Sequence, residues 1–263
     1  MLISTSATIS ASSIIESDVM IGPQVVIGPF CVISAGVQIG EGTIISSHTV
    51  ITGNTKIGSY NQIGMGSSIG EISQDLKYAG EAAGLEIGNR NRIGRHATLH
   101  RGTAQGGGLT RIGDDNNFER GVHIGHDCQV GNATFIGENS GLAGHVVLGD
   151  ESQIDAMCAV HQFCIIGTGA RLLAGSCVVQ DVPPYVQAGG NRASPQGINE
   201  RADAFRQAEP AVREVIHYLY DLLYHQQAAI EKVRLEIARL SAEYPLLCHF
   251  NEFFLRSARG IVR

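Results

Sequence analysis

The 263-residue chain contains no tryptophan and only seven tyrosines and eight phenylalanines. It has no apolar run of membrane-spanning length, and its first residues, MLISTSATIS, lack a basic segment followed by an apolar one. We therefore expect no transmembrane segment and no secretory signal, and we place the protein in the cytoplasm. The formal net charge of −6 also argues against a nucleic-acid partner, which would require a basic surface.

Cysteine is present but shows no spacing typical of a metal site or a disulfide framework. None of the six cysteines forms a CxxC pair. Cys31, Cys128, Cys158 and Cys164 occupy the small inward position of a repeat described next. We expect them to be packing residues, because free cysteine behaves as a small apolar side chain in cores.

The dominant feature of the sequence is a period of six. An isoleucine stands at every sixth position from Ile3 to Ile69 without a slip, and large apolar residues continue the period from Ile112 to Val178. A short run, Ile87, Ile93 and Leu99, lies between them. No amphipathic helix has this period, whereas a hexapeptide repeat is the signature of a parallel β-helix, in which three units close one triangular coil.

The residue two positions before each large apolar one is small or slender, which suits the narrow core of such a prism. Hexads of this kind form the left-handed version of the fold, an exception to the right-handed crossover rule. We predict a left-handed parallel β-helix over residues 1–190, followed by a C-terminal α-helical domain over residues 191–263.

Two segments, 71–86 and 101–111, interrupt the repeat. Ile69 and Ile87 are 18 residues apart, which we interpret as one hexad and a 12-residue loop, and Leu99 to Ile112 leaves about seven extra residues. Long loops in compact folds are usually functional or disordered. Counting coils places both loops at one edge of the prism, beside HIGHDC (123–128).

The same counting gathers polar side chains at that edge. Adding 18 residues aligns His126 with Gly144 and then Gln162, and aligns Asp127 with His145. The predicted cluster comprises His100, His123, His126, His145, His161 and Gln162. Five of the ten histidines beside a glycine-rich loop favour a functional site over scattered surface histidines.

His126 and Asp127 offer a general base with a carboxylate to orient it, and such a base contributes on the order of 100- to 10,000-fold. No serine or cysteine lies in a nucleophile-elbow motif. This favours direct transfer, in which the base activates an acceptor hydroxyl to attack a thioester, with the Gly144 amide as a candidate donor to the oxyanion. Counting alone leaves open which histidine is the base.

A different class of function is a zinc hydratase. His123, His126 and His145 could supply three imidazoles across a subunit boundary, as in the β-helical carbonic anhydrases. That hypothesis gives the two loops and the helical tail no role, so we expect no metal. A purely structural solenoid would have uniform edges.

After Val178 the repeat ends. Pro183 and Pro184 lack backbone donors and break the ladder, and residues 189–199 are interpreted as a linker. Helical spacing follows over Val212–Leu223 and Ile230–Leu240, and Pro245 is expected to open a last helix that turns Leu246, Phe250, Phe253 and Phe254 inward. We expect these helices to pack on the end of the prism or on a neighbouring subunit.

Several stretches give the chain a specific resemblance. They are QDLKYAGE (74–81), HRGTAQGGGLT (100–110), HIGHDC (123–128), AVHQFCIIG (159–167), QDVPPYV (180–186) and RSARGIVR (256–263). With the hexads they cover nearly the whole chain, which resembles the UDP-N-acetylglucosamine 3-O-acyltransferases that start lipid A synthesis.

The resemblance implies a cofactor-free homotrimer with active sites between subunits. It implies transfer of an (R)-3-hydroxyacyl chain from acyl carrier protein to the 3-hydroxyl of UDP-N-acetylglucosamine. By motif, His126 matches the catalytic base, Asp127 its partner and Gly144 the oxyanion amide. The positions that match substrate contacts are Asp75, Leu76, Lys77, His123, His145, His161, Gln162 and, for the nucleotide, Asn199.

The sequence departs from the family pattern at two places. Phe205 stands where a nucleotide-binding arginine is expected, so either diphosphate binding is altered or Arg206 or Arg201 supplies the contact. Ala174 takes the acyl-length position, where some members have glycine, and the chain length stays open. Arg92, Arg95 and Arg171 are candidates for binding the carrier protein.

The close alternative is an N-acyltransferase that acts on an amino sugar. The acyltransferase that acts on the glucosamine 2-amine later in the pathway carries an extra domain before its hexads. Here the hexads begin at Ile3, which counts against that enzyme but not against an acyltransferase for a 3-amino sugar nucleotide.

Overall fold

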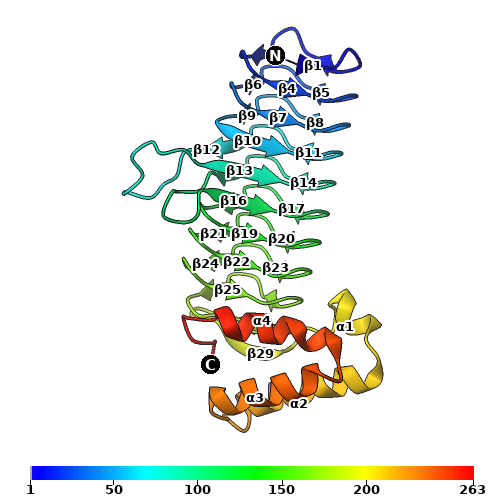
Figure 1. The fold of residues 1–263 in the computed structure, drawn as a ribbon, viewed down its shortest axis with the longest axis vertical. Coiled ribbons are helices and arrows are strands. Elements are labelled where there is room, and N and C mark those ends of the chain that lie inside the picture. The colour runs from blue at the N-terminus through cyan, green and yellow to red at the C-terminus, as the bar shows by residue number, and fades with distance from the viewer. Residues whose placement is uncertain (1) are drawn as a thin grey trace.

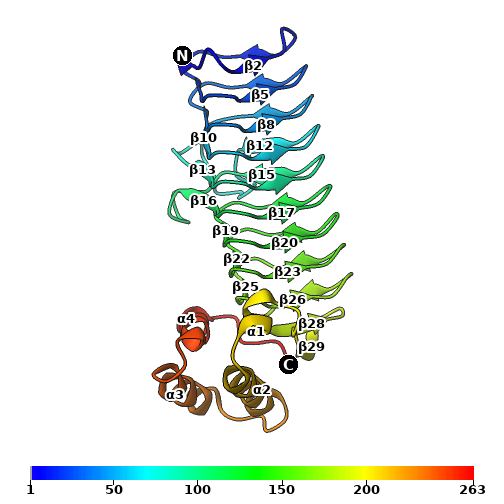
Figure 2. The same ribbon diagram turned by 90° about the vertical axis from the view of Figure 1, so that its right-hand side faces the viewer.

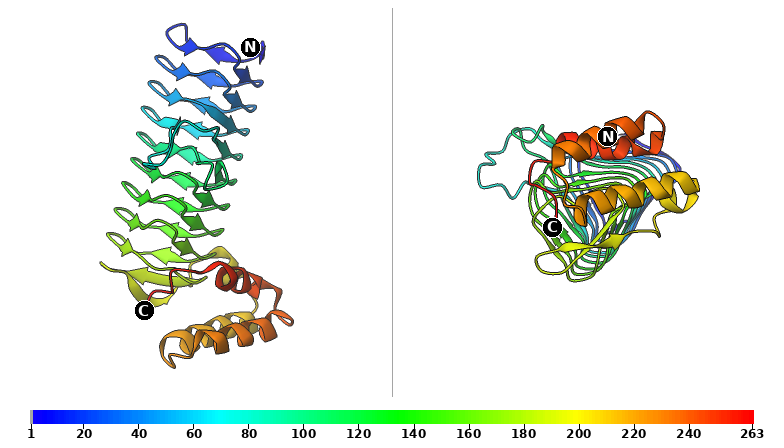
Figure 3. Two further views of the ribbon diagram at one scale, coloured as in Figure 1. Left: turned by 60° about the vertical axis from the view of Figure 1, so that its left-hand side comes forward. Right: turned by 90° about the horizontal axis from the view of Figure 1, so that it is seen from below.

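The computed structural model describes residues 2–263, and its main body is a stack of coils that form a prism (Figure 1). Each regular coil contributes one short strand to each of three parallel sheets, which we call sheets A, B and C. Seen along its long axis, the prism has a triangular outline (Figure 3). The predicted β-helix of hexapeptide repeats with a C-terminal helical region is confirmed.

Sheet A contains β1 (Leu2–Ile3), β4 (Met20–Ile21), β7 (Gln38–Ile39), β10 (Asn54–Ile57), β13 (Gly84–Ile87), β16 (Leu109–Ile112), β19 (Gln129–Val130), β22 (Val147–Leu148) and β25 (Ile165–Ile166). Sheet C contains β3 (Ile14–Ile15), β6 (Val32–Ile33), β9 (Val50–Ile51), β12 (Ser68–Glu71), β15 (Thr98–His100), β18 (His123–Ile124), β21 (Gly141–Leu142), β24 (Ala159–Val160) and β27 (Cys177–Val178).

Sheet B is the longest of the three. It contains β2 (Thr8–Ile9), β5 (Val26–Ile27), β8 (Ile44–Ile45), β11 (Gln62–Ile63), β14 (Arg92–Ile93), β17 (Asn117–Phe118), β20 (Phe135–Ile136), β23 (Gln153–Ile154), β26 (Arg171–Leu172), β28 (Val186–Gly189) and β29 (Ser194–Ile198). The pair β28–β29 is antiparallel. Residues 189–199 were interpreted as a linker from the sequence, and this was wrong, because most of them form this hairpin.

The large residue of each hexad points into the prism. Ile33, Ile51 and Ile69 are completely buried and stack directly on one another in sheet C. Full burial of one such side chain stabilises the fold by roughly 1.5–3 kcal/mol. The cysteines at 31, 128, 158 and 164 are buried or nearly so and unpaired, which confirms their predicted packing role.

Three asparagines also occupy the slender inward position, which the sequence-based pattern did not anticipate. Asn61 Oδ1 accepts from the backbone N–H and the side-chain amide of Asn91, and Asn91 Oδ1 accepts from the same groups of Asn116. All three are buried. This ladder satisfies the polar groups that burial would otherwise leave unpaired.

Both long loops leave the prism at the same corner. In each coil the chain runs from sheet A to sheet B to sheet C, and the turn from a sheet C strand to the next sheet A strand forms what we call the C–A edge. The loop of residues 72–83 connects β12 to β13, and the loop of residues 101–108 connects β15 to β16. The predicted placement of both insertions at one edge is therefore confirmed, and both stand out from the prism (Figures 1 and 3).

The C-terminal region contains α1 (Asp203–Gln207), α2 (Pro210–Tyr224), α3 (Ile230–Ser241), the 3-10 helix η1 (Pro245–Leu247) and α4 (Cys248–Arg256). The predicted helices correspond to α2, α3 and α4, whereas α1 was not predicted. At the last helix Leu247 is buried with the phenylalanines and Leu246 only partly, which shifts the expected inward face by one residue.

These helices pack on the end of the prism, as expected (Figure 2). Their apolar core includes Tyr185, Phe205 and Phe250, and the prism residue Ile165 packs against it. The buried carboxylate of Asp181 joins the two regions, because it accepts hydrogen bonds from the N–H of Ile165 and the hydroxyl of Ser257. The division of the chain at residue 190 stays a prediction.

Candidate active site

The predicted histidine cluster lies along the C–A edge. His123, Gly141 and Ala159 are paired in register in β18, β21 and β24, so the residues that follow these strands occupy equivalent places in successive coils. His126 therefore lies one coil from Gly144 and two from Gln162. The stacking deduced from the period of six is confirmed.

His126 and Asp127 form the central pair of this edge. His126 Nδ1 lies 2.8 Å from Asp127 Oδ2, and the side-chain exposures are 12% for the histidine and 0% for the aspartate. When the carboxylate is ionised it only accepts, so Nδ1 carries the proton and Nε2 is left with a free lone pair. This is the arrangement that a general base needs.

Gly144 lies directly against the free nitrogen of His126. A Cβ at this position would overlap Nε2 of the ring, so a side chain here would displace the histidine. The N–H of Gly144 has no protein acceptor within the part of the chain that the structure describes. The absence of a side chain at Gly144 therefore leaves space beside His126 Nε2, and the backbone N–H of Gly144 is free to donate a hydrogen bond.

Asp127 is held by two threonines of the neighbouring loop and strand. Thr103 donates its backbone N–H to Oδ1 and its hydroxyl to Oδ2, each over 2.8 Å. The backbone N–H of Asp127 donates to Thr110 Oγ1, also over 2.8 Å. The site is therefore built around a buried carboxylate with both oxygens hydrogen-bonded.

His145 approaches the same carboxylate from the next coil. Its Nε2 lies 3.7 Å from Asp127 Oδ2, and its ring stacks on Phe163 with centroids 4.4 Å apart. Burial lowers the pKa of His145, while the charges of Asp127 and, more weakly, Asp75 oppose that shift. His145 is therefore mostly neutral at pH 7 and offers a hydrogen-bonding group beside the base.

His100 and His123 form a second pair, with ring centroids 5.2 Å apart. His100 Nδ1 lies 2.7 Å from the carbonyl of Ile72, so this nitrogen is the donor. His123 Nδ1 lies 2.7 Å from Thr98 Oγ1. Burial, and secondarily the neighbouring His100, lowers the pKa of His123 to about 4. His123 is therefore a neutral polar group under ordinary conditions.

The remaining predicted residues of this edge are more exposed. His161 and Gln162 lie on the surface, and His161 lines a cavity of about 520 Å³ together with Arg192 and Arg259. In the loop of residues 72–83, Leu76 is fully exposed, and the carboxylate of Asp75 accepts a hydrogen bond from the backbone N–H of Lys77.

Other predicted site residues lie at different corners of the same prism. Ala174 is exposed on the turn between β26 and β27, which joins sheet B to sheet C. Asn199 is buried, and its amide donates to the carbonyl of Gly169, on the turn from sheet A to sheet B. One chain therefore does not bring Ala174 or Asn199 to His126.

Phe205, the first departure from the family pattern, and the neighbouring Arg206 lie in α1. Phe205 is buried in the helical core, and Arg206 is exposed and paired with Asp203 over 2.6 Å. Of the arginines considered for carrier binding, Arg171 is paired with Asp155, whereas Arg92 and Arg95 are exposed near sheet B. None of these five side chains lies on the C–A edge.

A set of potential metal ligands does occur at the centre of the site. Within residues 2–263, one ligating atom each of His126, Asp127 and His145 lie within 4.8 Å of one another. His123, which the zinc hypothesis required, is not in that set. Both oxygens of Asp127 already accept hydrogen bonds, from Thr103 and His126, so this donor set fits an orienting carboxylate better than a metal ligand.

Four residues that shape the site were not predicted from the sequence. Thr98 contacts His123, and Phe163 stacks on His145. Thr103 and Thr110 both contact Asp127. Thr103 and Thr110 stand in the motif HRGTAQGGGLT, which was the available signal. Counting coils located that loop but not the direction of its side chains.

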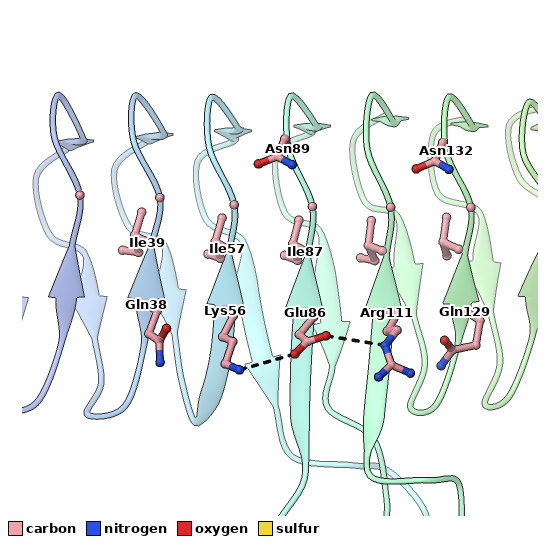
Figure 4. A pocket seen from close by; sticks show the side chains of 18 of the residues that line it. Gln38, Ile39, Lys56, Ile57, Glu86, Ile87, Asn89, Arg111, Gln129 and Asn132 are labelled. Carbon is pink, nitrogen blue, oxygen red and sulfur yellow. Dashed lines mark ion pairs between the residues drawn. The ribbon is translucent and has the colours of Figure 1, made fainter.

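A larger groove lies elsewhere on the prism. It runs along the outer face of sheet A, has a volume of about 1070 Å³ and contains no histidine (Figure 4). Three of its charged side chains form a row in which Glu86 lies 3.6 Å from both Lys56 and Arg111. All three are substantially exposed and paired with one another, so none of them is poised for proton transfer.

Comparisons with known proteins show which family the chain resembles. The family model described as UDP N-acetylglucosamine O-acyltransferase, domain 2, matches residues 181–262, and a bacterial transferase hexapeptide model matches residues 18–53 and 109–144. The structure of the UDP-N-acetylglucosamine acyltransferase of Francisella novicida is similar over all of this chain and 94% of its own, with 34% identity and a TM-score of 0.88.

Two further solved structures show the same likeness. The UDP-N-acetylglucosamine O-acyltransferase of Moraxella catarrhalis is 37% identical over the full length of both chains, with a TM-score of 0.87. The corresponding enzyme of Campylobacter jejuni is 30% identical over 97% of this chain and all of its own, with a TM-score of 0.88. This chain therefore belongs to the family of UDP-N-acetylglucosamine acyltransferases.

Proposed function

We propose that the protein transfers an (R)-3-hydroxyacyl chain from acyl carrier protein to the 3-hydroxyl of UDP-N-acetylglucosamine, the first step of lipid A synthesis. The observation that carries the proposal is the pair His126–Asp127, with a 2.8 Å hydrogen bond and a free Nε2 against Gly144. Its place in a chain that belongs to the family supports the choice of acceptor.

In the proposed reaction His126 Nε2 takes the proton of the sugar 3-hydroxyl while the oxygen attacks the thioester carbonyl. Asp127 holds the imidazole in the required tautomer and stabilises the imidazolium that forms. The tetrahedral intermediate then collapses, the carbon–sulfur bond breaks, and the imidazolium returns the proton to the leaving thiolate. The products are the sugar ester and the carrier thiol, with no nucleophile from the protein.

The N–H of Gly144 is the proposed donor to the oxyanion. It has no protein acceptor in the described chain, and it lies in the coil next to His126. A donor placed where charge develops is worth more in a site shielded from water than in solvent. Removal of such a donor typically costs on the order of 10²–10³ in kcat.

The surrounding side chains suit a neutral, hydroxyl-rich acceptor. His100, His123 and His145 are partly or fully buried. Burial lowers the pKa values of His123 and His145, so these two present imidazoles rather than cations. We assign Asp75, Leu76 and Lys77 in the loop to the sugar and acyl groups, and His161 and Gln162 to the outer part of the substrate.

We further propose a homotrimer with active sites between subunits. Ala174 and Asn199 lie at other corners of the prism than His126, so a site that uses all three needs two chains. A neighbouring subunit would supply Asn199, Arg206 and Ala174 to the C–A edge of the first.

Among residues 2–263 the structure has no helix that could span a membrane. We place the reaction in the cytoplasm, where carrier-bound acyl chains and sugar nucleotides are available.

An amine acceptor is the second candidate, because the same base serves a 3-amino sugar nucleotide. The feature that supports this candidate is Phe205, which is buried where the resemblance implies a nucleotide-binding arginine. The products differ chemically: hydroxylamine cleaves an ester and leaves an amide intact.

A zinc hydratase is the candidate from another class. Its test is metal analysis of the purified protein together with a carbon dioxide hydration assay. Stoichiometric zinc with hydration activity would replace the acyltransferase proposal.

The direct experiment incubates the purified protein with UDP-N-acetylglucosamine and a series of 3-hydroxyacyl carrier proteins of increasing length. We expect an ester product with a maximum at one length, which would calibrate the role of Ala174. Absence of transfer at every length by folded, trimeric protein would contradict the proposal.

A further inference from the structure

We propose that Thr103 is a positioning residue, which fixes the carboxylate of Asp127 so that it orients His126 and not His145. The proposal rests on the proposed function and deepens it, because it names the group that prepares the base for the acyl transfer. Thr103 stands in the loop of residues 101–108, which leaves the prism one coil before Asp127.

Thr103 contacts both oxygens of the carboxylate. Its backbone N–H donates to Oδ1 and its hydroxyl to Oδ2, each over 2.8 Å, and both residues are buried. Two donors from one residue to two oxygens define the plane of the carboxylate. The remaining acceptor capacity of Oδ2 is then directed at His126 Nδ1, also 2.8 Å away.

The direction of the threonine hydroxyl is itself determined by the loop. The backbone N–H of Gly106 donates to Thr103 Oγ1 over 3.1 Å, so this oxygen acts as an acceptor there and its own proton points to Asp127. The N–H of Gly108 donates to the carbonyl of Thr103 over 2.7 Å and closes the turn. Thr103 is therefore a prearranged donor and not a freely rotating hydroxyl.

Gly106 shows how closely the loop covers the carboxylate. A Cβ at this position would overlap all three terminal atoms of the Asp127 side chain, which has no room to move because it is buried and hydrogen-bonded. Only glycine allows the backbone to approach this near. The loop thus covers Asp127 as a lid that is part of the resting structure.

The need for such positioning follows from the second imidazole. Oδ2 of Asp127 lies 2.8 Å from His126 Nδ1 but only 3.7 Å from His145 Nε2. A carboxylate released from Thr103 could rotate toward His145, and His126 would then lose the partner that keeps its proton on Nδ1. Thr103 makes the choice between the two histidines before substrate binds.

The charges that face this group are few. His145 and the more distant Asp75, which interacts with it, lie on one side, and Glu81 accepts the N–H of Ala104 on the outer side of the loop. Loss of the Thr103 hydroxyl lets the carboxylate of Asp127 turn away from His126, so the imidazolium of His126 loses its negative partner. We expect the acid limb of the kcat/KM profile to move to lower pH in consequence.

The test compares Thr103→Val, which removes the hydroxyl at constant shape, with Thr103→Ser, which keeps it. We expect Thr103→Val to lower kcat/KM by about 10- to 100-fold, mainly through kcat, because misplacement of about 1 Å costs up to 10²-fold. Thr103→Ser should keep both the kcat/KM and the pH profile of the wild type. If Thr103→Val does not fold, Thr103→Ala replaces it.

A second measurement does not depend on activity. The ¹⁵N resonances of the His126 imidazole report which nitrogen carries the proton, and they should shift in Thr103→Val but not in Thr103→Ser. An inactive wild type would contradict the proposed function, while this spectrum would still decide the role of Thr103.

Two results would overturn the inference. One is a Thr103→Val protein with wild-type kcat/KM, pH profile and His126 resonances. The other is a loss of activity in Thr103→Val and Thr103→Ser alike with an unmoved profile, which would make the loop structurally important without a role in orienting Asp127.

Discussion

Two regions of the prism are built by the same hexad repeat and yet differ in chemistry. The face of sheet A has a groove of about 1070 Å³, and in its exposed row Glu86 pairs with both Lys56 and Arg111 (Figure 4). The C–A edge holds instead a buried carboxylate, its histidine partner and three further histidines in close contact.

The difference lies in the turns. Strand positions of a β-helix are paired on both sides and repeat with little change, whereas turns accept insertions without disturbing the stack. Ile57 and Ile87 remain in register across the coil that contains the loop of residues 72–83. Both loops could therefore be added at one edge, and there they cover polar groups that the strands alone would leave in water.

The largest expected effect comes from the buried carboxylate. Asp127→Asn keeps the shape but offers the wrong proton pattern to His126, so kcat/KM should fall on the order of 10³-fold or more. The measurement is steady-state acyl transfer, with thermal unfolding to confirm that the variant is folded. Near-normal activity in a folded variant would remove Asp127 from the mechanism.

A smaller but still large effect is expected at Gly144. The Cβ in Gly144→Ala overlaps Nε2 of His126 and would displace the ring, so we expect a loss on the order of 10²-fold in kcat/KM. The matched control is Gly141→Ala, where a Cβ meets only the side chain of His123 at 3.8 Å. Equal activities of the two variants would show that the space beside His126 is not needed.

The half-buried histidines should make the C–A edge acid-sensitive. His123 has its pKa lowered from 6.5 to about 4 by burial, so between these values the unfolded chain binds more protons than the folded one. Stability is therefore lost as the pH falls from 6.5 toward 4. We expect His123→Gln to reduce this loss by on the order of 1 kcal/mol, after allowance for partial exposure.

Urea denaturation of wild type and His123→Gln at pH 7.5 and pH 5 measures this difference. Identical pH dependence in the two proteins would mean that His123 is not the group that resists protonation. His145, whose pKa is also lowered by burial, would be the next residue to replace.

The smallest effect is expected in the groove of sheet A. Glu86→Gln removes two ion pairs of 3.6 Å between exposed side chains. Such pairs contribute about 0–1 kcal/mol each, so for two pairs the unfolding free energy should change by no more than about 2 kcal/mol. A much larger loss of stability, measured by urea denaturation, would show that this row is not a solvent-exposed surface feature.

The sequence predicted the prism well because one short-range rule, a large apolar residue every six positions, specifies each coil independently. It also placed His126, Gly144 and Asp127 correctly, since register in a coil is simple counting. It failed for the hairpin β28–β29 and helix α1, where the period ends and the chain follows contacts with the prism. It also missed Thr103, because the path of an inserted loop depends on the backbone groups that it must satisfy.

The most direct test of the whole account sets the two regions against each other in one assay. Acyl transfer from 3-hydroxyacyl carrier protein to UDP-N-acetylglucosamine would be measured for wild type, His126→Ala and Glu86→Gln. We predict a 100- to 10,000-fold loss of kcat/KM in His126→Ala, as expected for removal of a general base, and no loss in Glu86→Gln. A folded His126→Ala protein with wild-type activity, or an inactive Glu86→Gln protein, would contradict the assignment of the chemistry to the C–A edge.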